Sequence, residues 1–184
     1  MKNRILSFAL ALLVIALSVC SCASAQDTFE SFFVSIKKFD TEKMSKCTDA
    51  GSADYMDAVC TYAGLLSEEQ TEIVKSLFSK ISYSYITEPS ADAKSYEIKL
   101  SYVDVASLID TVEENMAIGT GNASKHIKEI IDSGAWEARY VKKADVTVSL
   151  SEDGGVILGH IGENADLTRL LGIDTFLRWY SAQR

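Results

Sequence analysis

The chain has 184 residues, of which 47% are hydrophobic and 24% are charged, and it contains a single proline. This composition is typical of one globular domain and excludes disordered and collagen-like classes of protein. The formal net charge of −8 argues against nucleic acid as a partner, and it predicts a surface that anionic lipid headgroups would repel.

The first 25 residues have the three regions of a bacterial-type secretory signal. A short basic start, Met1 to Arg4, precedes a nearly continuous apolar run from Ile5 to Val19, and small residues follow from Ser21 to Ala25. An uncleaved membrane helix is the alternative, because this stretch is just long enough to span the hydrocarbon of a bilayer. Its small and polar end favours cleavage, so we expect the chain to be exported.

Two cleavage sites compete at the end of this signal. The tetrapeptide Val19-Cys20-Ser21-Cys22 resembles the bacterial lipobox, in which the final cysteine is diacylated after cleavage. Cys22 is the predicted lipid carrier, and Cys20 is the alternative, which fits less well because it puts the bulky Val19 directly before the cysteine. An A-x-A site ending at Ala25 would instead release a secreted protein.

The lipobox interpretation divides the chain into a signal peptide, residues 1–21, and one α+β domain, residues 22–184; use of the other site would remove residues 1–25. Two acyl chains on Cys22 would attach the domain stably to the extracytoplasmic face of the cell membrane. The membrane is then a partner through the lipid and not through a basic surface.

The remaining cysteines, Cys47 and Cys60, are predicted to form a disulfide, because an exported protein meets an oxidising compartment. The loop is short, and closing it would stabilise the fold by about 3 kcal/mol if the bond is unstrained. Two free thiols are the alternative. A metal site is not expected, because neither cysteine has a CxxC partner or a nearby histidine.

The first half of the mature chain is predicted to be helical. Apolar residues recur at helical spacing in Asp27–Phe39, in Ala53–Tyr62 and from Ser67 to about Phe78, with a turn or short helix in Thr41–Cys47. The tetrapeptide beginning at Ser67 has the pattern of a capping box, and Asp40 is placed to cap the helix that follows it.

Two hairpins are predicted farther on, with helices between and after them. Alternating apolar residues indicate strands at 81–85, 96–102, 146–150 and 156–161. A helical insert from Asp104 to Gly134 separates the hairpins, and a closing helical stretch runs from about Ala165 to Tyr180. The fold class is therefore α+β: a mostly antiparallel sheet of about four strands packed against N-terminal helices.

The start of the mature chain resembles that of bacterial lipoproteins of the nuclear-transport-factor-like superfamily. The resemblance lies in Gln26–Phe33 and in the Lys-x-x-Asp-x-Glu-Lys turn within Ile36–Met44. It implies that the sheet curls into a cone with a pocket. Val156-Ile157-Leu158 replaces the Trp-x-Ile of many relatives, and the helical insert is larger than in the family's enzymes, so the resemblance transfers no enzyme activity.

One set of aromatic residues is a candidate ligand site. Four tyrosines share the apolar phase of the first hairpin and a tryptophan follows the inserted helices: Tyr83, Tyr85, Tyr96, Tyr102 and Trp136. They would line the pocket for a small apolar ligand, or they would form a packed core whose hydroxyl groups reach its rim.

No catalytic motif is found. His126 and His160 lie in no nucleophile or metal pattern and are interpreted as surface or half-buried residues, and Asp104 is the only carboxylate worth testing as an acid or base. We therefore expect a non-catalytic binding or interaction module of the cell envelope, without a cofactor, whose partner is a small apolar ligand or an envelope protein. An isomerase or dehydratase and a structural envelope protein are the alternatives.

Overall fold

Helices and one small sheet build the part of the chain that this computed structural model describes, residues 24–91 and 93–183. The helices are α2 (Ala25–Lys38), α3 (Thr41–Lys46), the 3₁₀ turn η1 (Ala50–Ser52), α4 (Ala53–Ala63), α5 (Glu68–Phe78), α6 (Val105–Ile118), α7 (Ala123–Asp132), α8 (Trp136–Tyr140), α9 (Ala165–Leu171) and α10 (Ile173–Ser181). The strands are β1 (Ser82–Tyr85), β2 (Ser95–Val103) and β3 (Val141–Ser149). The predicted α+β class is confirmed.

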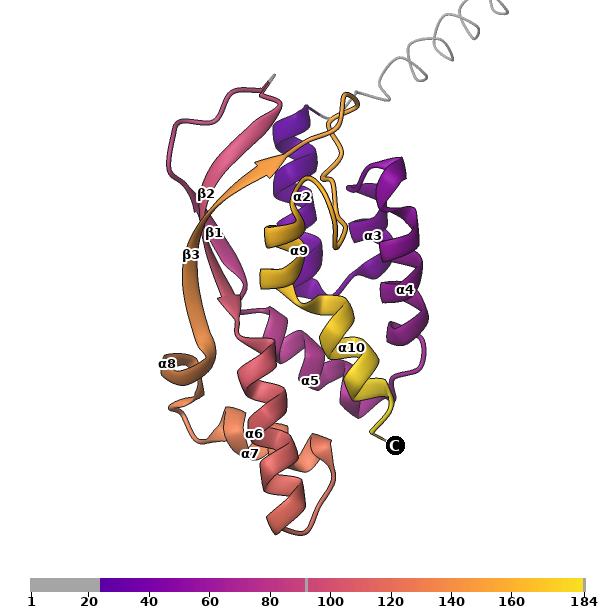
Figure 1. The fold of residues 1–184 in the computed structure, drawn as a ribbon, viewed down its shortest axis with the longest axis vertical. Coiled ribbons are helices and arrows are strands. Elements are labelled where there is room, and N and C mark those ends of the chain that lie inside the picture. The colour runs from indigo at the N-terminus through magenta and orange to yellow at the C-terminus, as the bar shows by residue number, and fades with distance from the viewer. Residues whose placement is uncertain (1–23, 92, 184) are drawn as a thin grey trace, which may run out of the picture.

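The sheet has the strand order β1-β2-β3, and both pairs are antiparallel. Figure 1 shows it on one side of the molecule, with α2 and α9 beside it and α3 and α4 beyond them. The first predicted hairpin is present, and the core-facing residue Ile98 of β2 stands opposite Val146 of β3. The prediction of about four strands is wrong, because the second hairpin lacks its return strand, and the sheet does not curl into the expected cone.

The segment that was expected to form a strand beside β3 pairs instead with the backbone of the loop after α3. Val156 makes isolated bridges to Leu150 and to Thr48, and its amide donates to the carbonyl of Cys47 at 2.9 Å. Gly155 permits this approach, because a Cβ atom there would lie 2.8 Å from the backbone nitrogen of Asp49. Backbone pairing with the loop after α3 therefore replaces a fourth strand.

An aromatic cluster joins α2 to the sheet. The ring of Phe29 lies 4.8 Å from that of Tyr96 and 5.1 Å from that of Tyr83, and Phe33 lies 4.5 Å from Tyr83, measured between centroids. Tyr85 completes the cluster at 5.9 Å from Phe29. Tilted and edge-on rings at these separations bury apolar area and add a favourable electrostatic contact.

Local capping signals agree with the helix starts. The Ser67 capping box begins α5, and Asp40 and Asp104 cap α3 and α6 by accepting from backbone amides in the first turn. A second capping box, unexpected from the sequence, joins Ser24 and Asp27 at the start of α2. Such caps satisfy amide donors that have no partner within the helix.

The predicted helical insert is present between β2 and β3. It consists of α6 and α7, and the short α8 extends it toward β3; the three lie together at one end of the molecule (Figure 1). Among residues 24–91 and 93–183, no helix is both long enough and apolar enough to cross a membrane. The predicted signal, Cys20 and Cys22 lie outside the described residues.

The predicted disulfide is wrong in this structure, where Cys47 and Cys60 are both free. Cys47 ends α3 and is buried under Val156, whereas Cys60 lies on the exposed side of α4, one residue after the fully buried Val59. Helical geometry points consecutive side chains in different directions, so the packing of Val59 turns Cys60 away from Cys47. Burial raises the pKa of the Cys47 thiol.

Replacing Phe29 with alanine should lower the free energy of unfolding by about 3–5 kcal/mol, because it removes a fully buried ring that contacts three tyrosines. Urea denaturation followed by circular dichroism measures the change. Val34→Ala, on the exposed side of the same helix, is the control and should change stability by less than about 1 kcal/mol. Equal effects of the two substitutions would contradict the packing described.

The two thiols should differ in reactivity when the folded, unreduced protein is treated with iodoacetamide at pH 8. Cys60 is exposed and should be modified rapidly; Cys47 should react slowly, because burial shields it and its raised pKa lowers the fraction present as thiolate. Peptide mass mapping assigns each site, and Cys60→Ser should abolish the fast reaction. Protection of both residues until a reductant is added would instead support the disulfide.

Candidate functional site

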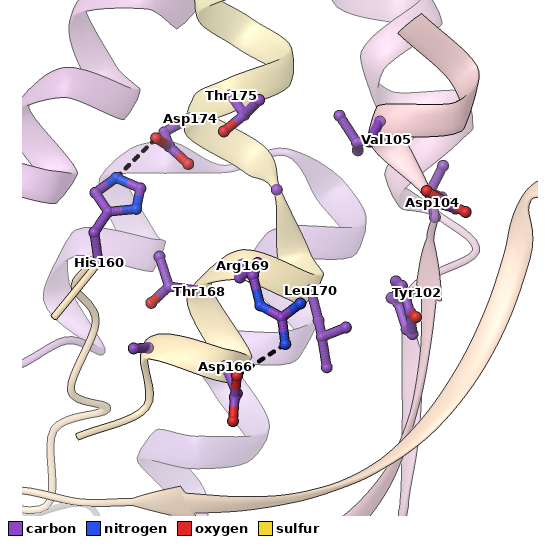
Figure 2. A pocket seen from close by; sticks show the side chains of 14 residues that line it. Tyr102, Asp104, Val105, His160, Asp166, Thr168, Arg169, Leu170, Asp174 and Thr175 are labelled. Atoms are coloured by element: carbon purple, nitrogen blue, oxygen red, sulfur yellow. Dashed lines mark hydrogen bonds and ion pairs between the residues drawn. The ribbon is translucent and has the colours of Figure 1, made fainter. Parts of the chain in front are cut away.

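A cleft with a volume of about 540 Å³ opens where the N-terminal ends of α6 and α10 meet α9. Figure 2 shows side chains from all three helices, from the end of β2 and from the loop before α9 around it. The lining residues with polar or charged side chains are Tyr102, Asp104, His160, Asp166, Thr168, Arg169, Asp174 and Thr175. The cleft therefore differs from the apolar pocket predicted from the sequence.

A contact between the side chains of Asp174 and His160 lies on the wall of the cleft. Asp174 Oδ2 is 3.1 Å from His160 Nε2, and the side chain of Asp174 is only 13% exposed, whereas that of His160 is 64% exposed. Gly172, with φ of +57°, ends α9 and begins α10, and this tight joint puts Asp174 in the first turn of α10. The partial positive charge of a helix N-terminus favours a carboxylate at this position.

Tyr55 lies behind this pair. Its ring is 5.8 Å from that of His160 in an edge-on arrangement, and its side chain is buried. Burial raises the pKa of Tyr55 far above its usual value, and the charge of Asp174 raises it further. The phenol therefore keeps its proton at any physiological pH and is a hydrogen-bond donor.

The Tyr55 hydroxyl and Asp174 Oδ1 are both buried and make no hydrogen bond of ordinary geometry among the described residues, yet hydrogen bonding to the Asp174 side chain contributes to the raised pKa of Tyr55, so the two groups face each other. Leaving such a group buried and unpaired costs about 1–3 kcal/mol, so native proteins keep few of them. Asp174 therefore interacts with Tyr55 on its buried side and with His160 through Oδ2.

The other charges of the cleft are already paired. Asp166 accepts from Arg169 at 2.9 Å on the exposed surface of α9, and Asp104 accepts from the backbone and the hydroxyl of Ser107 as the cap of α6. Asp104, the carboxylate selected from the sequence, is therefore a helix cap that also borders the cleft. Asp174 differs from Asp166 in that its side chain is mostly buried.

The predicted aromatic set is divided between different places. Tyr83, Tyr85 and Tyr96 pack on Phe29 and form part of a filled core, which was the alternative to a pocket. Tyr102 borders the cleft, and Trp136 borders a separate pocket beside α8.

The contact between His160 and Asp174 was not predicted from the sequence. The two residues are 14 positions apart, in a loop and a helix, and no known motif has this spacing. The one available signal was an aspartate two residues after Gly172, since a glycine that ends one helix and begins the next puts such a carboxylate at a helix N-terminus. Among the described residues, no group of three or more histidine, cysteine, aspartate or glutamate side chains is arranged to hold a metal ion.

Comparisons with known proteins do not assign a family. No protein-family model matches the chain, and no curated protein matches it. The search of solved structures returned the crystal structure of YcdA, a proposed lipoprotein from Bacillus subtilis, with an identity of 14% and a TM-score of 0.31. The match covers 84% of this chain and 58% of YcdA, so the chain spans less than two thirds of that protein. These values carry no argument about function, and they give no support to the nuclear-transport-factor-like resemblance.

Proposed function

We propose that this chain is an exported protein, held at the outer face of the cell membrane by a lipid on Cys22, which binds a small cationic ligand in the cleft without transforming it. The observation that carries the binding function is Asp174, a mostly buried carboxylate in the first turn of α10 that borders the cleft.

The start of α2 supports the lipobox over the competing cleavage site. Ser24 caps α2: its hydroxyl accepts from the amide of Asp27 at 3.1 Å, and its own amide donates to the Asp27 carboxylate. Ala25 packs against the core beside Gly154. A mature chain that begins at Cys22 keeps this cap, whereas one that begins at Gln26 loses a contact worth about 1 kcal/mol.

The chemistry of the cleft favours a cation as the ligand. An ammonium group supplies N–H donors for the carboxylate of Asp174, and hydrogen bonds between charged groups are about twice as strong as neutral ones. Tyr55 stays neutral, and Asp166 and Arg169 cancel each other, which leaves Asp104 and Asp174 as the other carboxylates of the cleft. The net charge of −8 would also attract cations toward the protein.

A second candidate function is catalysis by an isomerase or dehydratase. It is favoured by the His160–Asp174 pair, because a carboxylate that holds one imidazole nitrogen can orient the ring as a general base. The exposure of His160 favours binding instead, because general bases work best where water is excluded. Turnover of a bound amine would establish the enzyme.

A small amine should stabilise the protein, whereas a neutral molecule of the same shape should not. At ten times the dissociation constant, binding adds about 1.4 kcal/mol to the stability, which raises Tm by about 3–6 °C in a chain of this size. Differential scanning fluorimetry with butane-1,4-diamine and ethanolamine, compared with butane-1,4-diol and ethylene glycol at equal ionic strength, measures the difference.

Asp174→Asn should abolish that increase in Tm, because the amide keeps the shape of the side chain but removes its charge. Asp166→Asn is the matched control: it removes another carboxylate of the cleft, which is already paired with Arg169 on the surface, and the increase should persist. If neither amine raises Tm above its diol, the cation-binding proposal fails.

Cys22→Ser should move the protein from the membrane fraction to the soluble fraction of the cell envelope, because a serine at this position cannot carry the lipid. Cys20→Ser is the control and should leave the protein in the membrane, and the wild type should have the mass of a chain that begins at Cys22 with a diacylglyceryl group. A wild-type mass that begins at Gln26 would overturn the anchor and leave a secreted protein.

A further inference from the structure

A second pocket, with a volume of about 360 Å³, lies between α6, α7 and α8 in the helical insert. It shares no lining residue with the cleft around Asp174. The three helices lie together between β2 and β3, away from α3 and α4 (Figure 1). Any ligand bound here would therefore be independent of the function proposed above.

Two buried aromatic residues of α8, Trp136 and Tyr140, line this pocket. Ile130 of α7 adds partly buried apolar surface. Flat aromatic walls of this kind bind the apolar body of a small molecule through area burial and ring contacts. Trp136 was selected from the sequence as a pocket residue, and this pocket is the place where it lies.

Arg139 contributes a positive charge to the same lining. Its guanidinium lies 5.2 Å from the centroid of the Tyr140 ring, a cation–π distance, and it has no ion pair with a carboxylate among the described residues. The nearby carboxylate of Glu137 is bound to Lys80 at 2.6 Å. The guanidinium therefore keeps its fork of N–H donors for another anion.

The hydroxyl of Tyr140 is a second donor without a partner. It is buried, and no described residue accepts its hydrogen bond or donates to it. Thr111 and Ser133, which also line the pocket, donate their hydroxyl hydrogens to carbonyls of their own helices, those of Ser107 and Ile130. Of the hydroxyl groups that line the pocket, that of Tyr140 therefore keeps a hydrogen to donate.

Glu129 is the one carboxylate in the lining, and it is already engaged. One of its oxygens is 3.1 Å from Nδ1 of the buried His126, and the other is 3.8 Å from Nζ of Lys125. These contacts hold it along α7 and reduce its repulsion of an anion near α8.

We infer that the pocket between α6, α7 and α8 binds a small organic acid with a flat apolar body. The carboxylate of the ligand pairs with Arg139 and accepts from the Tyr140 hydroxyl, and the body packs on Trp136. The pair is favoured by the planar match between a guanidinium and a carboxylate. Recognition depends on that local geometry, because the whole chain is acidic and repels anions at long range.

The two tryptophans make this inference testable in the full chain. Trp179 lies on α10, so a Trp179→Phe background leaves Trp136 as the single reporter of fluorescence. Titration with phenylacetate, which does not absorb where tryptophan is excited, should give a saturable change in emission. Phenylacetamide, which has the same body without the charge, should bind about tenfold more weakly.

Arg139→Gln should weaken phenylacetate binding by about tenfold or more, and Tyr140→Phe should weaken it several-fold, while the affinity for phenylacetamide should fall less in the arginine variant. Arg178→Gln, on the exposed side of α10, is the matched control and should bind as the background does. Equal affinities for acid and amide, unchanged affinity in Arg139→Gln, or no saturable signal with either probe would each overturn the inference.

Discussion

The contact between α2 and the tyrosine face of the sheet is the one on which the rest of the structure depends. Phe29 contacts Tyr83, Tyr85 and Tyr96 at once, so a single helix position fixes the hairpin of β1 and β2 against the N-terminal helices. The hydroxyl of Tyr96 reaches the rim of the cluster, where it donates to the carbonyl of Ser90. These rings pack beneath the sheet, and the two pockets described above lie elsewhere, where helices end or diverge.

Both pockets described above follow from that constraint. One lies at the N-terminal ends of α6 and α10, and the other lies between the inserted helices and α8. In the first, the buried Tyr55 lies against the side chain of Asp174; in the second, the buried hydroxyl of Tyr140 has no hydrogen-bond partner among the described residues and its ring contacts Arg139. Unpaired polar groups of this kind destabilise a fold, and a ligand that pairs with them recovers the lost free energy.

Local sequence patterns predicted most of the helices and strands, but they did not predict the contacts between residues that are distant in the sequence. Ser67, Asp40 and Asp104 cap helices as expected, because a cap depends on only four consecutive residues. Apolar residues do alternate along the chain after Gly155, but a β-strand also needs a neighbouring strand. This segment instead forms backbone hydrogen bonds with Cys47 and Asp49. The His160–Asp174 pair and the separation of Cys47 from Cys60 likewise arise from packing between distant segments, which no local pattern encodes.

The contacts of the segment around Val156 also affect the order in which the parts of the chain can fold. Its bridge to Thr48, and the bond from the Leu158 amide to the Ser52 hydroxyl at 2.7 Å, join the first helices to the last third of the sequence. During synthesis, or during passage through a translocon in the exported form proposed above, the N-terminal helices emerge long before these partners. The N-terminal helices therefore remain incompletely folded until residue 158 has emerged. A chaperone or a protease would encounter the partly folded chain during that interval.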